Sequence, residues 1–559
     1  MLKDRKWSAS RLSIVFTILA LGLWSYSLTQ ANFHIGFLGI IESLPISFFI
    51  ALVFLTLASA ILWVSREKHG RLLFLQLIFF ITALWLTPVL IGGSLPFRIY
   101  RWWYWGEQIF QNGQLLPGVI PYHDWPGSLI VYSSVGQVLG IDLPPDMLVR
   151  IYPFLFQFLL LLPLYLLLRN TLGEYRNNYH WAAAWLFYLA NWVGQCIMSA
   201  QAIGFLLALF MFAILTKPNW QRGANALSYQ LIIIILLVTI IVTHTIASAA
   251  VFLIIVALFA ARRIEGVTLP ILALVFIASW AIYVAVFFFN EHVPALLMGI
   301  VRLDTLFAGS VAAGVSGSAS HGAIVNIRIL TSLMFLGIAF AGYLLSWKTK
   351  RSITADKTVL AMAIGALFLV MIIGASIGPE ALQRFWLFIL VPVAYFGVRL
   401  LNFKISAAIL VILLLIAVPL RIISHLGNEA VLHVSPAYVA SSQFIHERAT
   451  SGHRIGTIYT RFGKNLGGYG FYFDELEWRD NKLVLYSGYR DQGLGWEIDN
   501  VLPEGEPFYI FIGEWDKGYS DFNLNEPYFV DDVQDALDNT VNCNLIYSNL
   551  GQALYVSEE

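Results

Sequence analysis

Long apolar runs constrain this chain more than any other feature of its sequence. About thirteen segments approach the roughly 20 mostly apolar residues that a helix needs to cross a bilayer. They cover residues 12–29, 42–64, 72–92, 147–168, 180–198, 201–216, 229–244, 246–261, 267–289, 327–347, 358–376, 382–402 and 405–421. Only 12% of the residues are charged, against about a quarter in soluble domains. The sequence therefore predicts an all-α polytopic membrane protein.

The positions of Lys and Arg predict how the chain is oriented. They cluster at residues 3–11, 66–71, 169–176, 217–222, 262–263, 348–357 and 399–404, and alternate connections bring all of these clusters to one side. Because cytoplasmic loops are rich in Lys and Arg, we expect a cytoplasmic N-terminus and an odd number of spans. Residues 1–11 lead into an apolar run without a small-residue cleavage site, so we expect the first span to remain as an anchor in the plasma membrane.

Charge also divides the chain into two parts. Residues 1–424 carry 26 Lys and Arg against 13 Asp and Glu, whereas residues 425–559 carry 8 against 21. We expect residues 1–424 to form the transmembrane domain, with outer loops at 95–146 and 290–326. Residues 425–559 should form a small, soluble, extracytoplasmic α/β domain. Its predicted strands are 454–459, 468–473, 482–486, 508–512, 544–547 and 553–556, and its predicted helices are 436–450, which begins after a capping Ser435, and 530–539.

Residues 98–141 form the first long polar interruption and combine aromatic, basic and acidic side chains. Two groups recur at helical spacing on different faces: Arg101, Tyr104, Gln108 and Gln111, and Trp102, Trp105 and Ile109. This pattern predicts an amphipathic helix along the membrane interface, with Trp and Tyr at headgroup depth. The tryptophans alone could be a simple anchor, but the charged residues beside them favour a binding or reaction site.

Several motifs together resemble one enzyme superfamily. They are YWGEQIFQNG at 104–113, YHDWPG at 122–127, SAQA at 199–202, THT at 243–245, QRF at 383–385, NLIYSN at 544–549 and ALY at 553–555. In this order, and spread over nearly the whole chain, they resemble the GT-C superfamily of polytopic glycosyltransferases, of the dolichyl- or polyprenyl-phosphate-sugar-dependent type, with a divergent first outer loop. The resemblance implies a GT-C-like transmembrane domain.

The resemblance also implies an activity. GT-C enzymes of this type transfer a hexose or pentose from a polyprenyl-phosphate-linked donor to a lipid, glycan or protein acceptor on the extracytoplasmic face, as in cell-surface glycosylation. One departure leaves a second reading open. The family has an Asp about fifteen residues before the glycine that ends the first-loop helix, and counting back from Gly113 gives Arg98. The alternative is a non-catalytic GT-C-like binding or assembly subunit of a membrane complex; a secondary transporter is a third reading.

Such a transfer needs a carboxylate that takes a proton from the acceptor hydroxyl. Asp124 is the first candidate, because the HDWPG turn holds it at the mouth of the membrane. Glu107 on the predicted interfacial helix is the second, and Asp304 in the second outer loop is the third. Each has a plainer reading: a turn or helix cap for Asp124, a solvated helix face for Glu107, and an ion pair with Arg302 for Asp304.

The leaving phosphate needs cations, and the planar guanidinium of Arg suits phosphate oxygens. The candidates for the donor phosphate are Arg384, Arg328, Arg98, Arg101 and His321. Charges at membrane depth cost about 2.5–3.5 kcal/mol on insertion scales, so they tend to be paired or functional; snorkelling to headgroups is the plainer reading of the arginines. His321 follows small residues at 317–320, on a loop expected to be able to close over a substrate.

The sequence also bears on whether the protein binds nucleotides, metal ions or nucleic acid. The glycines at 467–470 are not followed by the Gly-Lys-Ser/Thr ending of a phosphate-binding loop, which argues against a nucleotide-driven pump. The acids on the outer side have no recognisable metal spacing, so no metal ligand is assigned and a divalent cation is left open as a cofactor. The expected partners are the lipid-linked donor, its acceptor and membrane lipids, and no nucleic acid.

Overall fold

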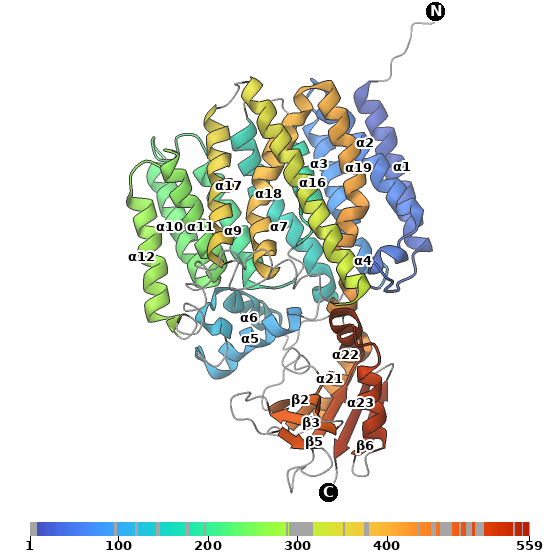
Figure 1. Cartoon of the computed structure of the whole chain (residues 1–559). Helices are drawn as coiled ribbons and strands as arrows, with labels where there is room; N and C mark the ends of the chain where they lie inside the picture. Colours follow the sequence, from blue (N-terminus) through green and yellow to red (C-terminus); the bar gives the residue numbers. More distant parts are fainter. Residues whose placement is uncertain are drawn as a thin grey trace, which may run out of the picture.

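The computed structural model describes residues 8–93, 98–117, 121–140, 146–173, 178–194, 197–286, 289, 317–349, 353–373, 379–433, 435–448, 454–458, 472–479, 482–487, 495–497, 508–539, 543–549 and 552–557. Helices form an upright bundle, and a small domain containing a β-sheet projects from one end of it (Figure 1). The protein is a helical polytopic membrane protein with a small C-terminal α/β domain.

Eight helices in the described part of the chain are long and apolar enough to cross a membrane. They are α1 (Ala9–Gln30), α2 (Ile46–Trp63), α7 (Asp146–Leu172), α10 (Ala226–Thr243), α16 (Ala319–Thr349), α17 (Ile353–Ile373), α18 (Pro379–Gly397) and α19 (Lys404–Leu426). The shorter helices of the bundle are α3 (Gly70–Trp85), α8 (Tyr179–Ala190), α9 (Ala200–Leu215), α11 (Thr245–Ala260) and α12 (Thr268–Tyr283). Each of the thirteen predicted apolar segments overlaps one of these helices.

Helix α8 occupies the centre of the bundle because it is apolar on every side. Of its residues, all except His180 are buried. Near the first helices the interior also contains a polar cluster. The Gln76 amide of α3 donates to the hydroxyls of Ser13 and Thr17 on α1, at 2.8 Å each, and accepts from Ser59 of α2 at 3.0 Å. In the apolar interior these mutual hydrogen bonds join α1, α2 and α3.

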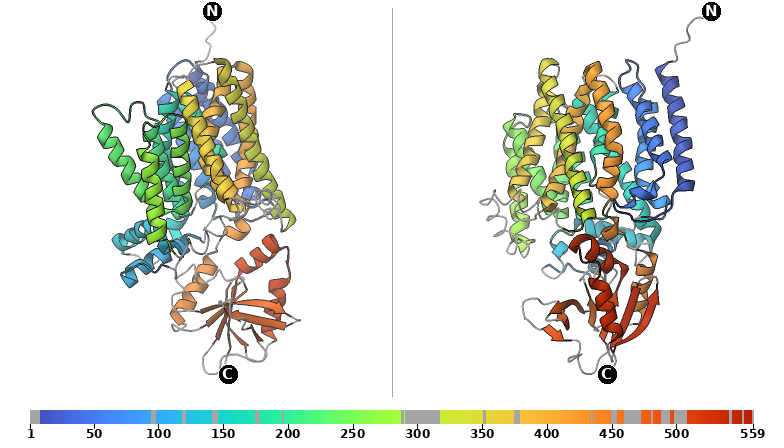
Figure 2. Two further views of the ribbon diagram at one scale, coloured as in Figure 1. Left: turned by 60° about the vertical axis from the view of Figure 1, so that its left-hand side comes forward. Right: turned by 45° about the vertical axis from the view of Figure 1, so that its right-hand side comes forward.

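The first outer loop contains α5 (Arg98–Asn112), η2 (Pro121–Asp124) and α6 (Gly127–Leu139). Figures 1 and 2 show α5 and α6 at the end of the bundle from which the C-terminal domain projects. The predicted helix in this loop is confirmed, and the Trp102 side chain on it is only 7% exposed. Its ring lies 4.3 Å from that of Tyr122, centroid to centroid, so it packs within the protein.

The C-terminal domain contains a seven-stranded sheet in the order β4-β3-β2-β1-β5-β7-β6. Its strands are β1 (Arg454–Thr457), β2 (Tyr472–Arg479), β3 (Lys482–Ser487), β4 (Gly495–Glu497), β5 (Phe508–Ile512), β6 (Cys543–Asn549) and β7 (Gln552–Ser557). β1 runs parallel to β2 and β5, and the other pairs are antiparallel. Helix α21 (Pro436–Arg448) begins as predicted, because the Tyr438 amide donates to the Ser435 hydroxyl at 3.1 Å.

Two strands differ from their predictions. β2 continues to Arg479 rather than ending at 473, and residues 468–471 of the predicted strand lie outside the described part of the chain. β4 was not predicted, because three residues that begin with a glycine carry too little pattern. Helix α23 (Phe529–Asp538) is confirmed.

Hydrogen bonds to backbone carbonyls join the sheet-containing domain to the end of the bundle. After α19 comes the short helix α20 (Glu429–Leu432), and the Trp515 indole of α22 (Glu514–Tyr519) donates to the Val431 carbonyl at 3.1 Å. In the segment η6 (Ser520–Leu524), the Phe522 carbonyl accepts from the Ser318 amide, just before α16, at 3.1 Å. The domain therefore contacts both α20 and the start of α16.

Candidate functional site

Asp124, the first candidate for the base, ends η2 and is 2% exposed. Its backbone carbonyl accepts a hydrogen bond from the Trp280 indole of α12 at 3.0 Å. The next residues, Trp125 and Pro126, are also buried, and α6 begins at Gly127. The turn predicted from HDWPG therefore exists, and its residues 123–126 are buried, with the Trp280 indole of α12 bonded to it.

The start of α6 contacts the end of α10. A Cβ atom added to Gly127 would lie 2.6 Å from the Thr243 hydroxyl and 3.1 Å from the Thr243 Cα atom, so only glycine permits this approach. The next residue, His244, caps α11, since its Nδ1 accepts from the Ala247 amide at 3.1 Å. The first outer loop is thereby held against the α10–α11 turn.

Arg384 belongs to the same neighbourhood. It lies in the second turn of α18, and its guanidinium is close enough to His244 to interact with it electrostatically. Gly127, three residues after Asp124, packs on Thr243, and the next residue, His244, is within electrostatic range of Arg384. The sequence candidates Asp124 and Arg384, 260 residues apart, therefore belong to two segments that both reach the α10–α11 turn.

Glu107, the second acid, is 8% exposed, so the solvated helix face that was its plainer reading is wrong. At the neighbouring position α5 packs tightly on α6. A Cβ atom at the neighbouring Gly106 would lie 2.8 Å from the Leu129 carbonyl and 3.3 Å from the Ser133 Cβ atom. The outer loop therefore contributes two buried carboxyl groups, Glu107 and Asp124, to this end of the bundle.

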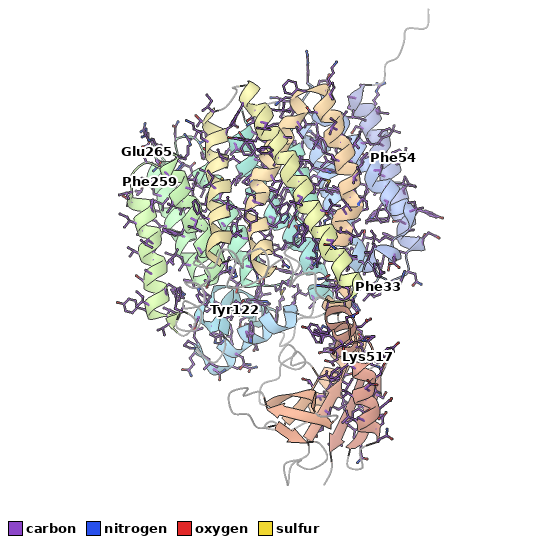
Figure 3. The ribbon with its side chains drawn as sticks, in the orientation of Figure 1. Phe33, Phe54, Tyr122, Phe259, Glu265 and Lys517 are labelled. Carbon is purple, nitrogen blue, oxygen red and sulfur yellow. The ribbon has the colours of Figure 1, made fainter. Side chains whose placement is uncertain are left out.

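Aromatic rings and one imidazole fix this loop internally. The ring of Tyr122 stacks on Trp105 with centroids 5.2 Å apart (Tyr122 is labelled beside α6 in Figure 3). The His123 ring is fully buried and lies between the Leu116 amide and the Trp105 carbonyl. Burial lowers the pKa of His123, although the hydrogen bond to Trp105 and the charge of Asp124 act in the opposite direction.

Arg328 is engaged in structural hydrogen bonds. Its Nε donates to the Ser424 carbonyl at 2.7 Å. With the Asn428 amide oriented so that its oxygen faces the guanidinium, both terminal nitrogens of Arg328 donate to that oxygen, at 3.0 and 3.3 Å. These bonds fasten α16 to the end of α19, and the guanidinium also lies 5.6 Å from the Trp192 ring centroid. Arg328 thus has a clear structural role beside any contact with phosphate.

His321 does not lie on a loop as expected. It occupies the first turn of α16, and its ring meets that of Phe522 edge-on with centroids 5.0 Å apart. The small residues before it resemble a flexible loop, yet the Ser318 hydroxyl accepts from the His321 amide at 3.2 Å and caps the helix. The histidine therefore packs between the bundle and the C-terminal domain.

Sequence reasoning missed two residues beside Arg328. Arg421 is fully buried, with its guanidinium 4.2 Å from the Trp85 ring centroid. The His425 Nδ1 lies 2.8 Å from the Trp192 carbonyl, and both Arg328 and Arg421 are near enough to affect its charge. In the sequence Arg421 lies at the end of an apolar run and looks like the end of a span. Only the packing of α19 in the structure shows that Arg421 and His425 lie near Arg328.

Some candidates fall outside what the structure describes. Asp304 lies in an undescribed segment. Arg98 and Arg101 lie in the first turn of α5, and their side chains are not described. Among the described residues, no three His, Cys, Asp or Glu side chains come close enough to hold a metal ion. A divalent cation therefore stays a prediction.

Comparisons with known proteins give distant structural likenesses. No family model and no curated protein match the sequence. Three solved structures of the Archaeoglobus fulgidus oligosaccharyltransferase are similar in fold. The complex with Zn and sulfate has a TM-score of 0.45 and 12% identity over 71% of this chain and 62% of that one. The apo form has a TM-score of 0.45 and 13% identity, over 72% and 64%.

The third structure is that of the same archaeal protein tethered to an acceptor peptide containing the NVT sequon through a disulfide bond. Its TM-score is 0.43 and its identity 12%, over 75% of this chain and 63% of that one. The matched part is thus less than two thirds of the oligosaccharyltransferase in each case. Likeness at this level does not establish a shared activity, so function rests on the residues of this chain.

Proposed function

We propose that this protein is an integral membrane glycosyltransferase. It moves a sugar from a polyprenyl-phosphate-linked donor to a lipid, glycan or protein acceptor, at the extracytoplasmic end of the bundle that carries the C-terminal domain. The observation that supports this most is that the segments carrying Asp124 and Arg384 both reach the α10–α11 turn, the first where Gly127 packs on Thr243 and the second where Arg384 acts on His244. A buried carboxyl group and a guanidinium are the two kinds of group that this transfer needs.

In the proposed reaction the Asp124 carboxylate accepts the proton of the acceptor hydroxyl while that oxygen attacks the anomeric carbon of the donor sugar. A bond forms between the acceptor oxygen and the anomeric carbon, and the bond from that carbon to the phosphate oxygen breaks. The phosphate leaves with the bonding electrons. Arg384 stabilises the charge that develops on it, by paired hydrogen bonds from its planar fork. Glu107 is a second buried carboxyl group on the same loop unit.

The test is transfer of radiolabelled sugar from a panel of polyprenyl-phosphate sugars by the full chain in lipid nanodiscs. We expect transfer by the wild type and at least a hundredfold loss in Asp124→Asn, in which proton acceptance is removed with almost no change of shape. Glu526→Gln, at an exposed position of the C-terminal domain, is the matched control and should keep full activity. Equal rates for Asp124→Asn and the wild type would refute the assignment of the base.

A second candidate function is a non-catalytic binding or assembly subunit. The observation in its favour is that α5 begins with Arg98, where the resemblance would place an acid. Under this reading the purified protein binds a lipid-linked sugar, measured by equilibrium binding in the same nanodiscs, and no donor and acceptor pair yields product. Product formation by the wild type excludes it.

A further inference from the structure

The imidazole of His123 has both of its ring nitrogens engaged. The Leu116 amide donates to Nδ1 at 2.8 Å, and Nε2 lies 2.9 Å from the Trp105 carbonyl oxygen. An amide N–H can only donate and a carbonyl can only accept, so the ring is neutral and carries its hydrogen on Nε2. The side chain is 0% exposed, which keeps water from replacing either bond.

These two bonds tie three segments of the outer loop together. Trp105 lies in the middle of α5, Leu116 lies in the stretch that follows α5, and His123 itself belongs to η2. On the other side of η2, the Trp280 indole of α12 donates to the Asp124 carbonyl. The short segment that carries the candidate base is therefore anchored both to α5 and to the bundle.

We propose that His123 is a positioning residue that holds η2 so that the Asp124 carboxylate keeps one place relative to Arg384. This inference rests on the proposed function. The neutral ring acts through its two hydrogen bonds and does not touch the reacting atoms. Positioning of this kind matters because a displacement of about 1 Å at a reacting group can reduce a rate about a hundredfold.

Three substitutions of His123 distinguish the contributions of its two hydrogen bonds. His123→Asn places an amide oxygen near the position of Nδ1, where it can accept from Leu116. His123→Gln places an amide N–H near the position of Nε2, where it can donate to Trp105. His123→Ala keeps neither bond. If the ring positions Asp124, kcat should fall by about 10- to 100-fold in His123→Ala, with the donor KM within about twofold of the wild type. Asn and Gln should each restore part of the loss.

The control for a merely structural effect is Asn178→Ala. The Asn178 amide donates to the Leu62 and Glu67 carbonyls at 2.8 Å each, next to the ends of α2 and α3 that lie away from the C-terminal domain. This variant should lower the thermal midpoint while each folded molecule keeps the wild-type kcat. If His123→Ala also keeps the wild-type kcat per folded molecule, the positioning role is refuted.

A second measurement tests the anchor without any enzymatic assay. In hydrogen–deuterium exchange of the full chain, the peptide that contains Leu116 should exchange faster in His123→Ala and stay protected in His123→Asn, which keeps the acceptor. If this pattern appears while the wild type transfers no sugar, the proposed function fails and His123 still holds η2. If exchange at Leu116 is the same in wild type and His123→Ala, the ring does not anchor the loop and the inference is wrong.

Discussion

Glu429 provides the sharpest prediction about stability, because a carboxyl group is buried where the bundle meets the C-terminal domain. The side chain lies in α20 and is 3% exposed. Among the residues that the structure describes, none forms a hydrogen bond with its Oε2 atom. Burial raises the pKa of Glu429 from its ordinary value of 4.5 to about 8. At neutral pH the folded protein therefore keeps this carboxyl group protonated.

The size of the effect follows from linkage. At pH 7 the unfolded chain loses the Glu429 proton and the folded chain retains it, so the folded state binds more protons. The folded protein therefore has its full stability below pH 4.5. Its free energy of unfolding decreases as the pH rises toward 8. One pKa unit corresponds to about 1.4 kcal/mol, so the penalty at pH 7 is about 3 kcal/mol. Glu429→Gln removes the ionisation from both states and should stabilise the protein by about that amount.

The assay is thermal unfolding of wild type and Glu429→Gln in the same detergent, at pH 4.5 and at pH 7. The two proteins should unfold at similar temperatures at pH 4.5, and the variant at a clearly higher temperature at pH 7. Glu526→Gln, which changes an exposed carboxylate in the same domain, should show no such dependence on pH. A Glu429→Gln variant no more stable than the wild type at pH 7 would refute the assignment of a buried, protonated carboxyl group.

Two further perturbations test the packing. Burial and the charge of Arg150 lower the pKa of His433 to about 4, so stability present above pH 6.5 should be lost as the pH falls toward 4. His433→Phe keeps an aromatic ring beside Phe33 (labelled in Figure 3) but has no ionisable group. Between pH 7 and pH 5 its thermal unfolding midpoint should therefore fall less than that of the wild type. Gln76→Leu removes the bonds that join α1, α2 and α3 and should cost about 1–3 kcal/mol in a denaturation curve. Leu75→Ala, 61% exposed on the same helix, should cost much less.

Hydropathy was enough to predict the helices because a spanning helix needs a long, continuous apolar run. All thirteen predicted segments overlap helices of the structure. In the C-terminal domain, a capping residue was enough to predict where a helix begins, as Ser435 was for α21. Such features depend on neighbours in the sequence, so they can be predicted from the sequence alone.

The site depends on contacts between distant segments, and there the sequence was less informative. Periodicity assigned Trp102 to one helical face but could not show that Tyr122 would cover it. Arg328 was expected to face phosphate, yet Ser424 and Asn428, about a hundred residues later, accept its hydrogen bonds. The packing of Gly127 on Thr243, which brings the segment after Asp124 to the α10–α11 turn, also became visible only in the structure.

The central claim is that Asp124 and Arg384 act in one site with different roles, as base and as phosphate ligand. A titration with a polyprenyl-phosphate sugar donor, comparing wild type, Asp124→Asn and Arg384→Lys in nanodiscs, tests it most directly. We expect Asp124→Asn to bind donor with wild-type affinity and to lose turnover. Arg384→Lys, which keeps the charge but lacks the planar fork, should bind donor more weakly. Unchanged donor affinity in Arg384→Lys together with wild-type turnover in Asp124→Asn would contradict the account.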